Sequence, residues 1–158
     1  VFRHSSMYGG RQFSTADQGW IGWFTQQAVE QAAAVVPTPF VISGDGLQVR
    51  DVLYADDMIT LYEQAVRHAD AAAGQAFNIG GGMANSLSLV ELFALLAELS
   101  GRDLVYTRQA ARASDQRVFV ADIAKARRLL EWEPKVSKHA GVAAMYEWVR
   151  SGVGGEQR

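Results

Sequence analysis

The sequence predicts an α/β fold, in which short strands alternate with helices along one domain. Apolar stretches with strand-like alternation are each ended by a glycine or proline turn. Between them lie amphipathic stretches with the period of a helix, and no internal repeat interrupts the alternation. The 158 residues, 49% of them hydrophobic, are enough for a domain with a packed core. This alternation is typical of an α/β or α+β architecture.

The first part of the chain is expected to form a strand and then a long helix. The strand covers residues 1–5 and ends at the turn of Gly9 and Gly10. The helix covers residues 17–35, with Asp17 as its N-cap. Its apolar face is expected to contain Ile21, Phe24, Ala28 and Ala32. Two prolines, Pro37 and Pro39, then end the helix.

The middle of the chain is expected to form two strands and a second helix. The strands cover residues 40–42 and 47–53, joined by an SGDG turn. The helix begins at Asp56, which we expect to cap it, and residues 69–74 form a linker. The buried face of this helix is expected to contain Ile59, Tyr62, Ala65 and Val66.

The C-terminal half contains the clearest helix signal, at residues 88–100. Ser88 and Glu91 have the spacing of a capping box, and Gly101 ends the helix. The apolar stripe of this helix consists of Leu92, Phe93, Leu96 and Leu99. The other elements expected here are strands at 76–79, 104–107 and 117–120, and helices at 121–130 and 137–149.

Composition excludes several classes of function. The formal net charge is −2, so the chain has no basic field for nucleic acid. It contains no cysteine, which excludes disulfides, thiolate metal sites and a cysteine nucleophile. No apolar run is long enough to cross a membrane, and no signal peptide opens the chain, so we expect a cytoplasmic protein. The histidines His4, His68 and His139 lack metal-ligand spacing, so we expect no metal site.

Two local patterns resemble ligand sites and also have a structural interpretation. The glycines at 80–82 follow a strand, but the helix starts too late for a phosphate-binding loop. We therefore expect a turn that lets the chain or a ligand approach closely. Trp20 and Trp23 form an aromatic cluster with Ile21 and Phe24. Core or subunit packing is the first expectation for this cluster, and a ligand platform is the second.

Arg50 and Arg112 are the most informative polar positions. Each lies beside a carboxylate in a segment that otherwise resembles a strand or loop, VRDV and RASDQRV. Each arginine could form a local salt bridge, or the two could close on one diphosphate, whose oxygens a guanidinium binds bidentately. The spacing does not choose between these interpretations. A tyrosine–lysine acid–base pair is not found, since no tyrosine is followed by lysine four residues later.

Four stretches, in order, resemble the C-terminal half of an extended short-chain dehydrogenase/reductase acting on nucleotide sugars. They are FRHSSMYGG, VISGDGLQVRDVLYADDM, FNIGGG and RASDQRVFVADIAKARRLLEWEP. The resemblance implies that residues 1–158 combine the C-terminal part of a Rossmann-like NAD(P)-binding fold with a small α/β substrate-binding subdomain. The family's GxxGxxG loop and its Ser/Thr and Tyr-xxx-Lys catalytic set would lie upstream of Val1. We therefore expect no catalytic residue in this chain, and no activity from it alone.

The resemblance also implies a role for particular residues. Arg50 and Arg112 would bind the diphosphate, and Asp115 the ribose hydroxyls. Ser114 stands where relatives have glycine, and Ser6 where many have a substrate-binding asparagine. The other implied positions are Val41 and Ile42 along the base, Gly19 and Trp20 near the phosphates, and His4 and Met7 beside the nicotinamide of NAD.

The implied activity is NAD-dependent epimerisation of a nucleotide sugar, by an enzyme that is expected to be a homo-oligomer. RHSSMYGGRQFSTADQGWIGWF and NIGGGMANSLSLVELF most resemble members that epimerise a CDP-sugar at C2 through a transient keto sugar. One alternative is a UDP-sugar 4-epimerase or a nucleotide-sugar 4,6-dehydratase. Another is a non-catalytic protein that binds nucleotide sugars.

Overall fold

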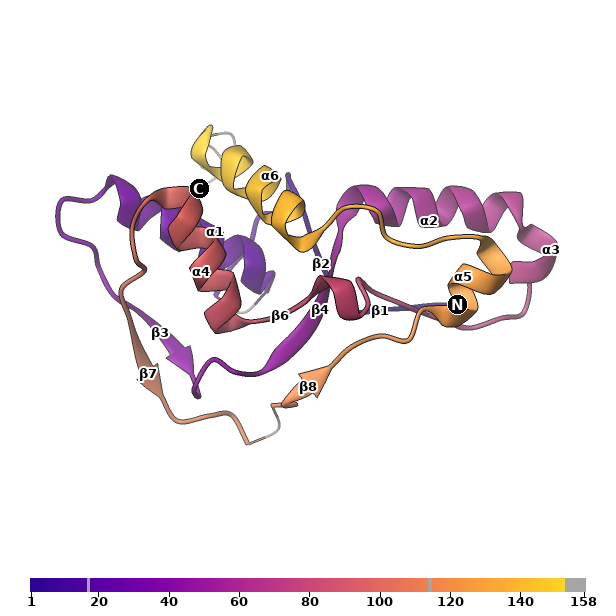
Figure 1. Cartoon of the computed structure of the whole chain (residues 1–158), viewed down its shortest axis with the longest axis horizontal. Coiled ribbons are helices and arrows are strands. Elements are labelled where there is room, and N and C mark those ends of the chain that lie inside the picture. The colour runs from indigo at the N-terminus through magenta and orange to yellow at the C-terminus, as the bar shows by residue number, and fades with distance from the viewer. Residues whose placement is uncertain (17, 114, 153–158) are drawn as a thin grey trace.

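The computed structural model describes residues 1–16, 18–113 and 115–152, which form an elongated molecule (Figure 1). Its central element is β4 (Val49–Tyr54). The first half of β4 pairs antiparallel with β6 and parallel with β8, and its second half pairs parallel with β2. These three partners are β2 (Ser6–Tyr8), β6 (Ser86–Ser88) and β8 (Val118–Phe119). The mixed α/β architecture predicted from the sequence is confirmed.

Two more pairs of parallel strands lie on either side of this sheet. In one, Phe2 is opposite Phe77, and in the other, Phe40 is opposite Tyr106. The strands are β1 (Phe2–His4) with β5 (Phe77–Ile79), and β3 (Phe40–Ser43) with β7 (Tyr106–Gln109). The described part of the chain thus makes three small sheets, and β1 continues after one residue into β2 of the next sheet.

The helices divide the apolar residues into two cores. The first core lies among α1 (Trp20–Ala33), α4 (Leu89–Ser100) and α6 (Lys138–Arg150), where Phe24, Phe93 and Met145 are buried. The second lies at the other end of the molecule, around Leu61, Phe77 and Leu130 (Figure 1). It is covered by α2 (Ala55–Arg67), α3 (Ala69–Ala72) and α5 (Ala124–Leu130). A short 3-10 helix, η1 (Met83–Asn85), precedes β6.

Helix α4 begins and ends as its sequence predicts. The Ser88 hydroxyl accepts from the Glu91 N–H at 3.2 Å, and the Glu91 carboxylate accepts from the Ser88 N–H at 2.6 Å. The Ser88 N–H and the Ser88 hydroxyl both donate to the Glu91 carboxylate, and they lower the pKa of Glu91 because they favour its charged form. Gly101 ends the helix in the left-handed region, with a φ of 70°. Only Leu99 of the expected stripe is more exposed than predicted, at 38%.

Helix α1 differs from its prediction at both ends. It begins at Trp20 with Gly19 as N-cap, whereas the predicted cap, Asp17, lies outside the described residues. Ala32 is exposed, and Gln31 is buried on the inner face in its place. The Gln31 amide explains this, because it bonds the carbonyl oxygens of Thr38 and Val105 at 2.9 and 2.8 Å. The inner face of the helix therefore accommodates the polar side chain of Gln31, because its amide has hydrogen-bond partners.

The predicted buried face of α2 is wrong at three of its four positions, while the fourth, Ala65, packs against the second core. Ile59, Tyr62 and Val66 are 59%, 46% and 77% exposed, while Leu61 is fully buried. The cause is Asp57, whose carboxylate is buried and faces the interior.

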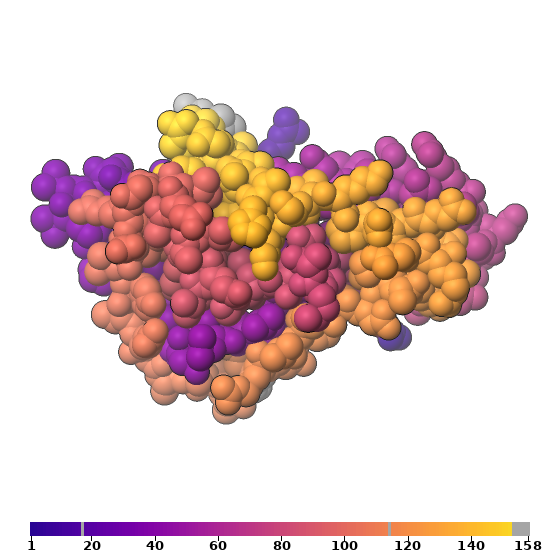
Figure 2. Space-filling model, viewed as in Figure 1, coloured from indigo at the N-terminus to yellow at the C-terminus, as the bar shows by residue number. Residues whose placement is uncertain are grey.

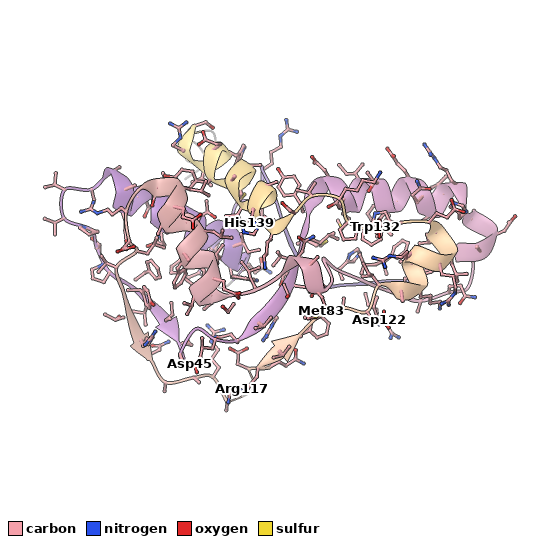
Figure 3. All side chains as sticks on the ribbon, viewed as in Figure 1. Asp45, Met83, Arg117, Asp122, Trp132 and His139 are labelled. Carbon is pink, nitrogen blue, oxygen red and sulfur yellow. The ribbon has the colours of Figure 1, made fainter. Side chains whose placement is uncertain are left out.

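The Asp57 carboxylate accepts from the backbone N–H groups of Lys135 and Val136, both at 2.9 Å. The indole of Trp132 donates to the Asp57 carbonyl at 3.0 Å. Trp132 lies between α5 and α2 (Figure 3). The predicted cap was also wrong: Tyr54 is the N-cap, no side chain caps the helix, and Asp56 lies exposed in the first turn.

Several short elements were not predicted. Residues 6–8 and 86–88 are strands because they pair with β4, and residues 69–72 form a helical turn. At Ser5 the chain passes from one sheet to the next. Its N–H donates to Ile79 and its hydroxyl to Asp51, at 2.8 and 2.5 Å.

The glycine turn at residues 80–82 packs against the buried carboxylate of Asp51. The Gly82 N–H donates to this carboxylate at 3.1 Å. A Cβ at Gly80 would collide with the same carboxylate, and a Cβ at Gly81 would collide with the Val52 carbonyl. The close approach expected at these glycines is thus made by β4 rather than by a ligand. The hydrogen bond from Gly82 also explains why an aspartate lies inside a core strand.

Within the described ranges, no helix is long and apolar enough to cross a membrane. The same residues contain no group of three or more histidine, aspartate or glutamate side chains that could hold a metal ion.

Candidate functional site

One pocket, with a volume of about 620 Å3, lies where α1 begins and β3 ends. The start of β4 and the segment between β7 and β8 form its other walls. Figure 2 shows that segment, in orange, along the lower edge of the molecule beside the purple β3–β4 turn. In Figure 3 the same two segments carry the labels Arg117 and Asp45. The pocket therefore joins parts of the chain that are distant in sequence.

All eight residues that the resemblance implies for substrate binding line this pocket. They are Ser6, Gly19, Trp20, Val41, Ile42, Arg50, Arg112 and Asp115. They come from β2, α1, β3, β4 and the β7–β8 segment, so only the fold brings them together. Ser114, which replaces the family glycine, lies outside the described residues.

Arg50 is the charged centre of the pocket. Its side chain is 21% exposed, and its Nη2 lies 2.8 Å from Oδ1 of Asp115. Its Nη1 donates to the Val49 carbonyl at 2.8 Å. Arg50 thus forms a salt bridge, but with a residue far along the chain rather than with its neighbour Asp51, which is buried. A guanidinium has further N–H donors, so this pairing is compatible with an anionic ligand.

Arg112 and Asp115 reach the pocket from one tight turn. The Asp115 N–H donates to the Arg112 carbonyl at 3.1 Å, which brings the two side chains to the same wall. Arg112 is exposed, whereas the Asp115 side chain is 31% exposed. Arg50 and Arg112 therefore place two cationic groups around one hollow that also contains a carboxylate.

Three polar pocket residues were missed by the sequence analysis. Gln48 donates to Oδ2 of Asp115 at 3.2 Å and to the Ser43 carbonyl at 3.3 Å. Gln109 donates to the Ser43 hydroxyl at 3.1 Å. A signal for Gln48 was present, because it lies two residues before Arg50 in an extended segment and so shares its face. Ser43 and Gln109 carry no such signal.

Aromatic and aliphatic side chains form the opposite wall. Trp20 and Trp23 line the pocket with Phe24, whose ring also packs in the first core. The Trp20 indole donates to the Ser6 hydroxyl at 3.2 Å, which holds both side chains. Gly19 has a φ of 72°, a conformation that suits glycine. The aromatic cluster thus serves both the core and the pocket.

His4 and Met7 do not line this pocket. The His4 ring packs near Phe2 and Tyr62, and burial lowers its pKa. Among the described residues its buried Nδ1 has no hydrogen-bond partner. Met7 packs against the second core. The structure therefore separates the two positions implied for NAD from the eight implied for the substrate.

The nearby tyrosines Tyr8 and Tyr54 do not suit acid–base chemistry at neutral pH. Burial first, and then Tyr54 and Asp57, raise the pKa of Tyr8 far above its usual value. The pKa of Tyr54 is raised by burial and by Asp56. The two rings pack edge to face, with centroids 5.5 Å apart, and both phenols remain protonated. Tyr8 lies in the first core, and Tyr54 packs against it.

Comparison with known proteins identifies the family. The family described as GDP-mannose 4,6 dehydratase matches residues 1–145. The chain belongs to this family. Its members include the epimerases and dehydratases of the extended short-chain dehydrogenase/reductases, so the resemblance found in the sequence is confirmed.

The relatives that this chain resembles include an epimerase and a dehydratase. CDP-paratose 2-epimerase of Salmonella typhi is 57% identical over 151 residues, which are 96% of this chain and 44% of that protein. dTDP-glucose 4,6-dehydratase of Streptomyces griseus is 38% identical over 108 residues, which are 66% of this chain and 31% of that protein.

Solved structures show the same fold. UDP-glucose 4-epimerase of Thermotoga maritima with UDP-glucose has a TM-score of 0.77 and 32% identity, over 97% of this chain and 46% of that one. UDP-glucuronic acid 4-epimerase of Bacillus cereus with UDP-glucuronic acid and NAD has a TM-score of 0.76 and 28% identity, over 95% and 44%. The chain therefore spans less than half the length of these relatives.

Proposed function

We propose that the protein containing this chain is an NAD-dependent nucleotide-sugar epimerase, and that the chain supplies its nucleotide-sugar-binding part. The observation that carries the proposal is the convergence of eight implied substrate positions on one pocket, around Arg50. The chemistry of the pocket supports it. Two arginines suit a diphosphate, a carboxylate suits hydroxyl groups, and an apolar wall suits a base.

Each part of the ligand has a place in this arrangement. The diphosphate lies between Arg50 and Arg112, and the ribose hydroxyls donate to Asp115. The base packs along Val41 and Ile42, in the middle of β3. The sugar then extends toward Ser6, near the start of α1. Because the charged anchor is at the diphosphate, the sugar can turn within the site while the nucleotide stays bound.

We propose that His4 and Met7 contact the nicotinamide of NAD. His4 fits such a contact, because its buried Nδ1 lacks a partner among the described residues. His4 and Met7 would hold the nicotinamide, and NAD would supply hydride transfer to and from the sugar carbon. The chain's own residues bind and orient the nucleotide sugar. The Ser/Thr and Tyr-xxx-Lys set would come from another part of the protein, so this chain alone is expected to be inactive.

The β1–β5 sheet supports the proposal that this chain is part of a larger protein. It has two parallel strands, whereas parallel sheets are normally buried on both faces and contain more strands. Ile59 and Val66 also expose apolar surface on α2, beside this end of the molecule. We propose that a dinucleotide-binding part continues this sheet and covers that face. The homo-oligomer and the cytoplasmic location remain predictions from the sequence.

The specific reaction we propose is that of a CDP-paratose 2-epimerase, which inverts C2 through a transient keto sugar to give CDP-tyvelose. The 57% identity to that enzyme of Salmonella typhi supports this choice. The test is to incubate the full-length protein with NAD and CDP-paratose and to analyse the sugar by NMR. CDP-tyvelose is the expected product. Conversion of UDP-glucose or dTDP-glucose instead would establish one of the alternative reactions, and binding without conversion would indicate a non-catalytic protein.

Arg50→Ala is expected to weaken binding of CDP by about 1.5–3 kcal/mol, the loss expected for a hydrogen bond to a charged group. Isothermal titration of the full-length protein with CDP measures the change. Arg108→Ala is the matched control, because this exposed arginine packs over the Tyr106 ring and does not line the pocket. An affinity that Arg50→Ala leaves unchanged would exclude Arg50 as the anchor.

A further inference from the structure

We infer that Gln48 is a positioning residue, which holds the Asp115 carboxylate in place for the ribose hydroxyls. The inference rests on the proposed function, because it assumes that the pocket takes a nucleotide. It starts from the segment that carries Asp115. The described residues 110–113 and 115–117 belong to no helix or strand, and the Asp115 N–H donates to the Arg112 carbonyl.

A carboxylate on such a segment samples several rotamers, and a ligand that requires one of them must restrict it. Restricting a side chain on binding costs affinity unless the protein has already done so. Asp115 is restricted here by two donors. Arg50 binds Oδ1 at 2.8 Å, and Gln48 binds Oδ2 at 3.2 Å. With one donor on each oxygen, the plane of the carboxylate is defined.

Gln48 is itself fixed from its other side. Its Nε2 also donates to the Ser43 carbonyl at 3.3 Å, at the end of β3. One amide group therefore links the β3 end, the start of β4 and the β7–β8 segment. Because Gln48 and Arg50 are two residues apart in an extended stretch, both side chains reach the same carboxylate from one edge.

The neutral amide suits this position better than a charged group. A second cation would compete with Arg50 for Asp115, and it would neutralise more of the negative charge of the carboxylate. A carboxylate would repel Asp115. Each carboxylate oxygen accepts more than one hydrogen bond, so the two donors leave acceptor capacity for a pair of hydroxyls. Gln48 therefore supports recognition of the ribose rather than of the diphosphate.

The test is Gln48→Ala in the full-length protein, titrated with CDP, 2′,3′-dideoxy-CDP and inorganic pyrophosphate. The variant is expected to bind CDP about ten-fold more weakly, as for one lost hydrogen bond to a charged group. Affinities for dideoxy-CDP and pyrophosphate should stay within about two-fold, since neither has the ribose hydroxyls. Gln48→Glu retains the size of the side chain and should bind CDP at least as weakly as Gln48→Ala. Gln75→Ala, an exposed glutamine outside the pocket, is the control.

The ratio of CDP to dideoxy-CDP affinity separates the outcomes. A ratio that narrows in Gln48→Ala but not in Gln75→Ala supports the inference. Equal weakening of all three ligands would mean that Gln48 only maintains the pocket's structure, and would overturn it. If the unmodified protein binds CDP but does not distinguish it from dideoxy-CDP, the inference fails while the nucleotide site stands. If the unmodified protein binds none of the three ligands, the proposed function fails as well.

Discussion

Asp57→Ala is expected to lower the free energy of unfolding by about 3 kcal/mol, because it removes a buried carboxylate that accepts hydrogen bonds from two backbone N–H groups. These are the backbone groups of Lys135 and Val136, each 2.9 Å from the carboxylate. They hold the connection between α5 and α6 against α2. Denaturation by urea, followed by circular dichroism on the full-length protein, measures the change.

Asp56→Ala is the matched control for this substitution. Asp56 occupies the same first turn of α2 but is exposed, and no side chain caps the helix. Its loss should cost no more than about 0.5–1 kcal/mol, through the helix dipole alone. Equal effects of the two substitutions would show that Asp57 acts through the helix dipole and not through the connection.

Gly81→Ala is expected to destabilise the protein by about 3 kcal/mol or more, as overpacking does in a buried site. The added Cβ would collide with the Val52 carbonyl in the central strand, and would lie 2.6 Å from the Asn85 Cβ. Backbone atoms of a paired strand cannot move aside as a flexible side chain can. The melting temperature, measured by differential scanning calorimetry, should fall by several degrees.

Gly10→Ala serves as its control. At Gly10 the nearest atoms to an added Cβ are those of the Trp148 ring, at 3.4 Å, and the residue is exposed. Its expected effect is within about 0.5 kcal/mol. If Gly81→Ala were as mild as Gly10→Ala, the glycine turn would not be packed against β4 as the structure has it.

Elements with strong local signals could be predicted from the sequence. The Ser88 and Glu91 capping box and the Gly101 stop determine α4 through contacts within a few residues. The strands of β2 and β6 were missed because each has three residues, too few for a periodicity, and exists through its pairing with β4.

The buried face of α2 could not be predicted, for a physical reason. The sequence of α2 contains two neighbouring apolar stripes. An aspartate beside one of them favours the interpretation that this stripe faces solvent. Asp57 is nevertheless buried, because its acceptors are satisfied by Lys135 and Val136 from the far end of the chain. A local pattern contains no information about such a partner.

The candidate site shows the same division. Arg50 stood out in the sequence because an arginine interrupts a strand, yet its partner Asp115 lies 65 residues away. Composition and spacing left the role of Arg50 open. The family resemblance implied that Arg50 binds the diphosphate. Gln48 was not singled out, although it lies two residues before Arg50 and on the same face of an extended segment.

The most direct test of the account is a crystal structure of the full-length protein with CDP bound. The account predicts the diphosphate beside Arg50 and Arg112, the ribose hydroxyls on Asp115, and the base along Val41 and Ile42. A nucleotide bound at another place, with this pocket occupied by solvent, would contradict it.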